Sequence, residues 1–163
     1  MGKSYSKTKG KNYERELSKF LSSVFNLNFE RVPASGAFTG GKNAWRTGKL
    51  TPAQLLLSDG DLIVPEELAH CKFECKWYKE FSFSSLFDNN STLNEWVNQS
   101  QDGSDKIWFL CIKINHNGQF LVFDKRLKPK FKLNESYMLY QDKYIMTKMD
   151  NFFETNKEAI LNL

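Results

Sequence analysis

The 163-residue sequence predicts an α/β domain in which helices lie against a mixed β-sheet. Helical and strand-like periodicities are interspersed along the chain. Residues 107–114 form an apolar run continuous enough for a strand that is buried on both faces, and Asn117-Gly118 then marks a tight hairpin. Hydrophobic residues make up 40% of the chain and aromatic residues 15%, which suffices for a packed core. We expect a single domain over residues 1–163.

Residues 10–27 predict an amphipathic helix, preceded by a mobile basic N-terminus at residues 1–9. Glu14 lies at the edge of the apolar face, so its carboxylate can reach a neighbouring site, whereas Glu16 is expected to face solvent. From the helix alone, an ordinary first-turn glutamate favoured by the helix dipole explains Glu14 better. The residues that form the apolar face recur at helical spacing: Tyr13, Leu17, Phe20, Leu21 and Val24.

Residues 29–33 predict a short strand that carries Arg31. From residue 34 the composition changes to ASGAFTGGKNAWRTGK, which contains four glycines and predicts a loop, with residues 37–57 as an insertion. Small residues let a backbone approach a phosphate closely. The loop also supplies hydrogen-bond donors suited to a DNA backbone, namely Ser35, Lys42, Arg46 and Lys49.

Residues 62–64 and 71–77 are two apolar runs joined by a polar turn, which predicts an antiparallel hairpin. Side chains alternate along a strand, so Phe73, Cys75 and Trp77 share one face of the second run, and Glu74 and Lys76 share the other.

Folding this hairpin brings Asp61 towards Glu74, with Lys76 beside them. Two close carboxylates repel unless a cation lies between them, and hard oxygen ligands suit Mg²⁺ or Mn²⁺. A neighbouring lysine can stabilise charge on a phosphate oxygen. These are the parts that phosphodiester hydrolysis needs. An Asp followed by Glu-x-Lys also occurs by chance on many solvated strands, so the pattern alone is a weak signal.

The C-terminal half continues the alternation of helices and strands. Pro129 indicates a loop or an edge within the basic run KRLKPKFK at residues 125–132. Lys79, just after the run at 71–77, is a candidate for contact with the bound DNA. The predicted elements are a helix at 86–101 interrupted near Asn89-Asn90, strands at 107–114 and 119–123, a hairpin of 137–140 with 144–147, and a helix at 149–161.

Basic residues are concentrated in the first third of the chain. Residues 1–50 carry a net charge of +7 and residues 51–163 a net charge of −3. This distribution suits a polyanionic partner, or else a basic N-terminal tail that only adds solubility. The three cysteines lie in apolar runs and are expected as reduced core thiols. No apolar run approaches the roughly 20 residues that span a bilayer, and the N-terminus lacks a signal-peptide core. We expect a cytoplasmic protein with no membrane contact.

Five short motifs together resemble the PD-(D/E)xK nucleases, and specifically the archaeal-type Holliday-junction resolvases and their phage-encoded relatives. The resemblance covers residues 10–79, and their order is more specific than any single motif. The C-terminal half carries no matching motif. In order, the motifs are Gly10-x-x-x-Glu14-Arg15-Glu16-Leu17, Arg31, Ser35-Gly36, Gly60-Asp61 and Glu74-Cys75-Lys76.

The resemblance implies a restriction-endonuclease-like core, a divalent metal (Mg²⁺, with Mn²⁺ as substitute) and a homodimer that cuts two strands symmetrically. A phage enzyme would act in the host cytoplasm. It implies that Lys76 is the catalytic lysine, that Arg31 and Ser35 lie near the scissile phosphate and that Arg15 is a DNA-contacting or structural residue. The implied metal ligands are the carboxylates of Glu14, Asp61 and Glu74 and the backbone carbonyl of Cys75.

Two departures from the family pattern affect these expectations. Gly60-Asp61 replaces Pro-Asp, a tolerable change because the carboxylate carries the chemistry and glycine permits a tight turn; Asp59 is a weaker alternative for the first acid. The loop at 37–57 is longer than in the compact resolvases, which affects substrate choice.

The sequence thus predicts a Mg²⁺-dependent endodeoxyribonuclease acting on branched DNA such as a four-way junction. The alternatives are a restriction- or repair-type nuclease of the same fold acting on linear duplex, a nuclease directed at RNA, and a DNA-binding module without catalysis. The predicted DNA-binding residues are Arg15, Arg31, Ser35, Lys42, Arg46 and Lys79.

Overall fold

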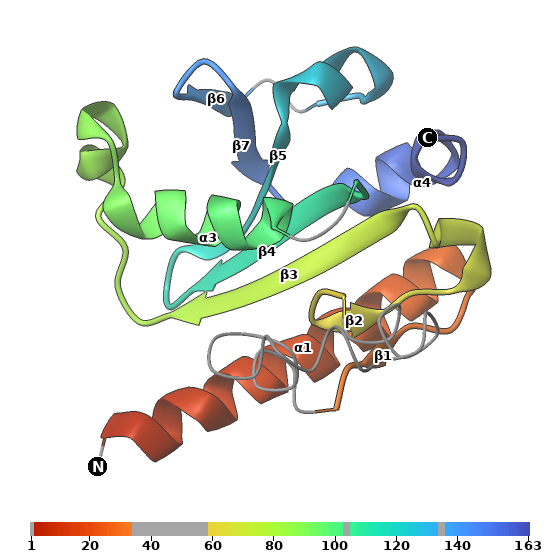
Figure 1. Ribbon diagram of the computed structural model, residues 1–163, viewed down its shortest axis with the longest axis horizontal. Helices are drawn as coiled ribbons and strands as arrows, with labels where there is room; N and C mark the ends of the chain where they lie inside the picture. Colours follow the sequence, from red (N-terminus) through yellow and green to blue (C-terminus); the bar gives the residue numbers. More distant parts are fainter. Residues whose placement is uncertain (1, 34–58, 103–104, 134–135) are drawn as a thin grey trace.

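The computed structural model describes residues 2–33, 59–102, 105–133 and 136–163 (Figure 1). The inserted loop predicted at 37–57, with Ser35, Lys42 and Arg46, lies outside the described residues. The elements in chain order are α1 (Gly2–Phe25), β1 (Glu30–Arg31), β2 (Leu62–Ile63), the 3₁₀ helix η2 (Glu66–Leu68), β3 (Cys71–Tyr78), η3 (Phe83–Asp88), α3 (Ser91–Gln101), β4 (Ile107–Ile114), β5 (Gly118–Asp124), η4 (Lys125–Lys130), β6 (Tyr137–Tyr140), β7 (Tyr144–Lys148) and α4 (Phe152–Leu161).

The main sheet has five strands in the order β3-β4-β5-β7-β6. The β3 and β4 strands run parallel, and the other neighbours are antiparallel, so the sheet is mixed and the predicted α/β class is confirmed. The β4 strand is buried along most of its length and lies between β3 and β5, as its continuous apolar run predicts. The predicted hairpins β4-β5 and β6-β7 both form.

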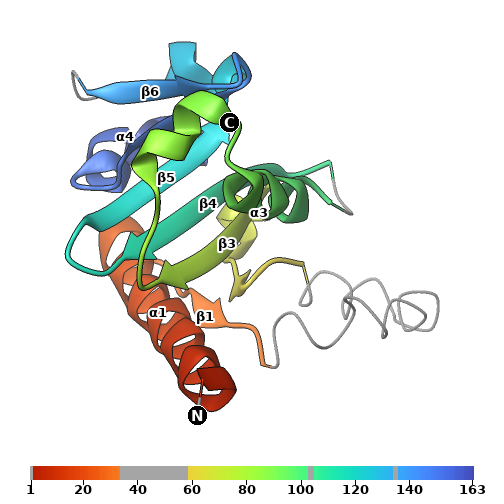
Figure 2. The same cartoon turned by 90° about the vertical axis from the view of Figure 1, so that its left-hand side faces the viewer.

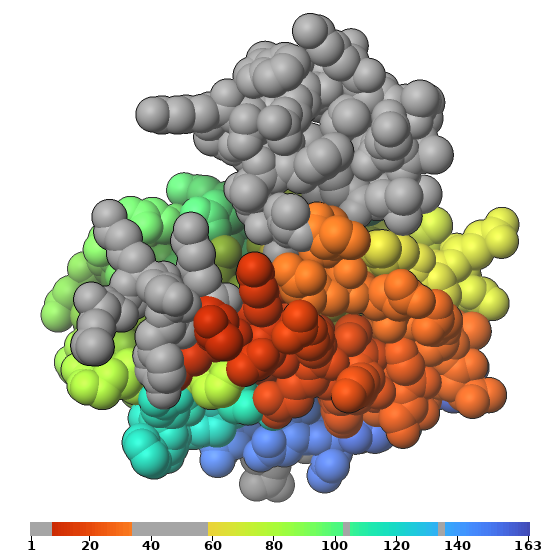
Figure 3. Space-filling view, turned by 90° about the horizontal axis from the view of Figure 1, so that it is seen from below, coloured from red at the N-terminus to blue at the C-terminus, as the bar shows by residue number. Residues whose placement is uncertain are grey.

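Helices cover both faces of this sheet. On one face, α1 and α4 pack on a core rich in phenylalanine, in which Phe73 stacks on Phe109 with ring centroids 5.3 Å apart. On the other face, α3 packs through Leu93 and Trp96 onto a second core. Figure 2 shows α1 and α3 on different sides of the sheet, and Figure 3 shows α1 extending across one face of the molecule with α4 beside it. The cysteines are buried free thiols, as expected.

The predicted hairpin of residues 62–64 with 71–77 is wrong. The β2 strand pairs with β1 instead, in a separate two-stranded antiparallel sheet with Arg31 opposite Leu62. The β3 strand pairs with β4, and α3 lies within the long crossover that parallel pairing requires. One edge of β3 therefore pairs with no strand in the described part of the chain.

Helix α1 begins at Gly2, eight residues before the predicted start. Residues 2–9, expected as a mobile tail, form its first turns. Gly10 lies inside the helix without ending it, because an internal glycine costs only about 1 kcal/mol relative to alanine.

Candidate active site

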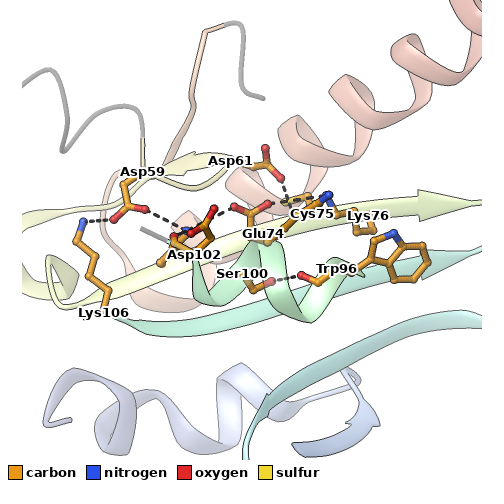
Figure 4. Close-up of polar contacts among 11 residues, drawn as sticks. Asp59, Asp61, Glu74, Cys75, Lys76, Trp96, Ser100, Asp102 and Lys106 are labelled. Carbon is orange, nitrogen blue, oxygen red and sulfur yellow. Dashed lines mark hydrogen bonds and ion pairs between the residues drawn. The ribbon is translucent and has the colours of Figure 1, made fainter. Parts of the chain in front are cut away.

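Asp61 is fixed against the unpaired edge of β3. Its backbone N–H donates a 2.9 Å hydrogen bond to the Phe73 carbonyl, and the Cys75 N–H donates a 2.8 Å bond to its Oδ2 atom. Asp61 is only 9% exposed. Its carboxylate thus occupies the position that a neighbouring strand would take, and satisfies a strand N–H that would otherwise lack an acceptor. Figure 4 shows Asp61 beside Cys75 and Glu74.

Gly60 makes this approach possible. Its φ of +79° lies in the left-handed region, which proline cannot adopt and other residues adopt at a cost. A Cβ at this position would lie 2.9 Å from the Phe73 carbonyl oxygen. The departure from Pro-Asp noted in the sequence therefore has a structural reason, because this backbone brings Asp61 to β3 only with glycine before it.

Glu74 and Lys76 lie on the face of β3 opposite Phe73 and Cys75, as the alternation predicts. Lys76 Nζ donates a 2.7 Å hydrogen bond to Gln99 Oε1 on α3, and lies 4.0 Å from Glu74 Oε2. No pattern in the sequence indicated Gln99 as a site residue. The interaction holds the ammonium beside the carboxylate.

The Glu74 carboxyl lies close enough to Asp61 for a side-chain hydrogen bond. Burial, followed by the negative charge of Asp61, raises the pKa of Glu74 to about 8, although Lys76 and Lys72 oppose the shift. The two acids therefore resist ionising together. A cation between them would offset the repulsion by Asp61, which adds to the effect of burial on this pKa.

Lys72 is a further charged group at this site that sequence reasoning missed. Its side chain is 5% exposed; its Nζ lies 3.2 Å from Asp59 Oδ1 and 3.9 Å from Glu74 Oε1, and donates a 3.0 Å hydrogen bond to the Asp102 carbonyl. Asp59, the weaker candidate for the first acid, also pairs with Lys106 at 3.1 Å (Figure 4). The signal was present, because Lys72 precedes Glu74 by two residues and so shares its face.

Glu14 and Arg31, both predicted site residues, pair with each other. Glu14 is buried at the edge of the α1 core face, and Arg31 Nε lies 2.5 Å from its Oε2. The expectation that Glu14 faces the interior and Glu16 the solvent holds, because Glu16 is exposed and pairs with Lys113 at 2.6 Å. The Glu14–Arg31 ion pair itself was not foreseen, since 17 residues separate the partners.

Two other predicted DNA-binding residues lie on the surface. Arg15 is exposed on α1, and its Nη1 donates a 3.4 Å hydrogen bond to Asn12 Oδ1. Lys79 follows β3, is 79% exposed and lies 3.4 Å from Glu80. Neither interaction buries the charge, so both side chains are available to a phosphate.

The donors at the β3 edge fit a hard divalent cation. In a strand the N–H and C=O of one residue point the same way, so the Cys75 carbonyl faces the edge at which its N–H meets Asp61. Mg²⁺ is commonly held by one or two carboxylates together with waters and substrate phosphates, a role for which Asp61 and Glu74 suffice. Across residues 2–33, 59–102, 105–133 and 136–163, no three His, Cys, Asp or Glu side chains group closely enough to hold a metal ion. The Glu14 carboxylate is paired with Arg31.

Comparisons with known proteins identify a relative and a family of this chain. Protein D14 of Escherichia phage T5 is 35% identical over 104 residues, which cover 60% of this chain and 56% of that protein. The match therefore spans little more than half of the relative's length. No solved structure matches this chain. Among the described residues, no helix is long and apolar enough to cross a membrane.

A protein family described as "Phage putative PDDEXK endonuclease" matches residues 5–162. PD-(D/E)xK nucleases generally use divalent metals. The match extends over nearly the whole sequence, so the chain belongs to this family of phage endonucleases of the PD-(D/E)xK type, with the restriction-endonuclease-like core that its mixed sheet and flanking helices predict.

Proposed function

We propose that this protein is a Mg²⁺-dependent endodeoxyribonuclease that hydrolyses phosphodiesters in branched DNA. The observation that supports this most is the position of Asp61, fixed against the edge of β3 beside Glu74 and Lys76. The charge of Asp61 helps to raise the pKa of Glu74, and these two close carboxyl groups next to an ammonium suit a cation and a phosphate. Binding DNA without cutting it would gain nothing from buried negative charge.

Asp61, Glu74 and the Cys75 carbonyl would hold the metal ion. When bound, a divalent ion neutralises charge on the phosphate and lowers the pKa of water. Lys76, restrained by Gln99, would donate to a phosphate oxygen and stabilise the charge that develops there. Lys72, between Asp59 and Glu74, would keep the Glu74 carboxylate in position.

Arg31 and Glu14 would act on the substrate side of this centre. The Arg31 guanidinium suits a phosphate oxygen, and its ion pair with Glu14 orients it without a substrate. Glu14 can join the metal ligands only if Arg31 exchanges its carboxylate partner for a DNA phosphate.

The preference for branched DNA and the homodimer belong to the same proposal. Both are supported by the ordered motifs in residues 10–79, which resemble those of junction resolvases. A homodimer would present two β3 edges to two strands of one junction. The enzyme would act where phage DNA is processed, in the host cytoplasm.

A substrate panel tests the proposal. Labelled four-way junction, flap, nicked duplex, linear duplex and RNA are incubated with the protein in Mg²⁺, in Mn²⁺ and in EDTA. We expect Mg²⁺- or Mn²⁺-dependent cuts near the branch point of the junction and slower cutting of linear duplex. Equal cutting of junction and linear duplex would contradict the branched preference, cutting of RNA alone would contradict the DNA substrate, and cutting in EDTA would contradict metal dependence.

A further inference from the structure

A basic surface lies at the end of the sheet away from β3, where Lys128 of η4 lies over Tyr137 of the edge strand β6. Residues 125–132 contain five lysine or arginine residues and no acid. Most of these side chains are exposed. The η4–β6 surface is defined here by Arg126, Lys128, Lys130, Lys132 and Tyr137.

The backbone that carries these charges is fixed. Phe131 is buried between the lysines, and its ring lies 5.4 Å from that of Phe123 and 5.3 Å from that of Phe152. The buried Asn156 side chain accepts a 2.7 Å bond from the Lys132 N–H and donates a 3.0 Å bond to the Lys132 carbonyl. The chain is thus anchored at Phe131 and Lys132, directly after Lys130, unlike a basic tail that is merely solvated.

The charges of the η4–β6 surface are only partly neutralised. Arg126 pairs with Asp124 at 2.7 Å, and Lys125 pairs with the exposed Asp142 at 3.0 Å. Lys130 and Lys132 are exposed and form no ion pair with any acid of the described chain. Positive charge without a counter-charge, held on a rigid backbone, favours an anionic partner.

An aromatic ring accompanies this charge. The Lys128 ammonium lies over the Tyr137 ring, 4.7 Å from its centroid, and Tyr137 is 41% exposed on β6. Basic groups interleaved with an exposed aromatic ring suit the phosphates and bases of a nucleic acid better than an acidic peptide, which offers no flat ring to stack.

The η4–β6 surface lies far from the catalytic residues. The β3 and β6 strands form opposite edges of the five-stranded sheet, four strand spacings or roughly 19 Å apart. Phosphates bound here therefore cannot be those bound at Asp61. We propose that the η4–β6 surface binds the phosphate backbone of a DNA segment away from the scissile bond, such as a second arm of the substrate. This inference rests on the proposed function for the identity of the polyanion.

Binding measured in EDTA tests this proposal without cleavage. Anisotropy of a labelled four-way junction is compared for wild type, the double variant K130E/K132E and the control K148E/K157E. The control makes the same change in net charge through lysines of β7 and α4, outside the η4–β6 surface. We expect K130E/K132E to bind about tenfold more weakly near 0.1 M salt, with a salt slope shallower by about 2, because each lost phosphate contact removes about 0.9. The control should change less than about twofold.

Several outcomes would overturn the inference. Equal weakening of K130E/K132E and the control would assign the effect to net charge, and unchanged binding by K130E/K132E would remove the surface from DNA contact. Binding of labelled polyglutamate by wild type that is lost in K130E/K132E, while junction binding is unchanged, would assign the surface to an acidic protein. If K130E/K132E melts below wild type, K130Q/K132Q replaces it, with the same expected change in salt slope. Failure of the wild type to cut DNA with Mg²⁺ would contradict the proposed function instead, so the two failures are distinguishable.

Discussion

The two outer edges of the five-stranded sheet carry the same residue types in opposite environments. At the β3 edge, Lys72 is 5% exposed and is held between Asp59 and Glu74. On the η4–β6 surface, Arg126 is 87% exposed, although it too has an acidic partner, Asp124. A buried charge needs fixed partners and is unavailable to a second molecule, whereas an exposed charge can exchange its partner for a phosphate at little cost.

This difference indicates different roles for the two edges. Burial at the β3 edge raises the pKa of Glu74 and fixes Asp61, which suits chemistry on one phosphate. Exposure at the η4–β6 surface suits long-range attraction of many phosphates. Matched substitutions at both edges therefore test whether the two edges have different roles.

The largest difference is predicted for cleavage after neutralisation of one aspartate at each edge. D61N should lower the rate of Mg²⁺-dependent cleavage by about 1,000-fold, because it removes a negative ligand from the proposed metal site. Asparagine retains an oxygen for the Cys75 N–H, so the melting temperature should change little. D142N, beside Lys125, should cut like wild type. Cleavage by D61N within tenfold of wild type would remove the distinction.

The second prediction concerns stability against pH in EDTA. The pKa of Glu74 rises from its ordinary 4.5 to about 8 on folding, so between these values the folded state holds a proton that the unfolded state lacks. The free energy of unfolding should therefore fall as pH rises through this window, by on the order of a few kcal/mol. Urea titrations at several pH values measure it.

E74Q is the control for this pH dependence. The free energy of unfolding of E74Q should change less with pH across the same window, because glutamine does not titrate. The free energy of unfolding of K130Q/K132Q should depend on pH as that of wild type does. Parallel curves for wild type and E74Q would contradict the burial argument.

The third prediction compares two glycines in the left-handed region, Gly60 and Gly118. G60A should lower the free energy of unfolding by about 2–3 kcal/mol, because the added Cβ would lie 2.9 Å from the Phe73 carbonyl in addition to the backbone strain. G118A has open space and should cost only about 1 kcal/mol. Denaturant melts measure both. Equal losses of unfolding free energy in G60A and G118A would show that the close approach of residue 60 to β3 does not affect stability.

The smallest predicted effect comes from removing one lysine at each edge. K72M should lower kcat about tenfold, because Glu74 loses the ammonium that restrains it. K128M should leave kcat at saturating DNA unchanged and raise KM. Single-turnover and steady-state kinetics separate these parameters. A reduced kcat in K128M, or an unchanged one in K72M, would reverse the roles assigned to the two edges.

Local patterns in the sequence predicted much of this site. The alternation of Phe73, Glu74, Cys75 and Lys76 assigned each side chain to the correct face of β3, since a period of two follows from strand geometry alone. The same alternation would have identified Lys72 had it been extended two residues further back.

Non-local pairing was not predictable in the same way. The hairpin between residues 62–64 and 71–77 was wrong because β3 pairs with β4, more than 30 residues later, and nothing in either strand specifies its neighbour. Asp61 nevertheless lies beside Glu74. A single backbone hydrogen bond, from the Asp61 N–H to the Phe73 carbonyl, takes the place of the expected strand pairing. The pairing of Glu14 with Arg31 likewise depends on where β1 packs against α1.

The central claim is that the β3 edge holds a divalent metal through Asp61. Calorimetric titration of Mn²⁺ into wild type, D61N and D142N without DNA tests it most directly. We predict that wild type and D142N bind Mn²⁺ equally, and that D61N binds at least about tenfold more weakly. Equal Mn²⁺ affinity in all three proteins would contradict the claim.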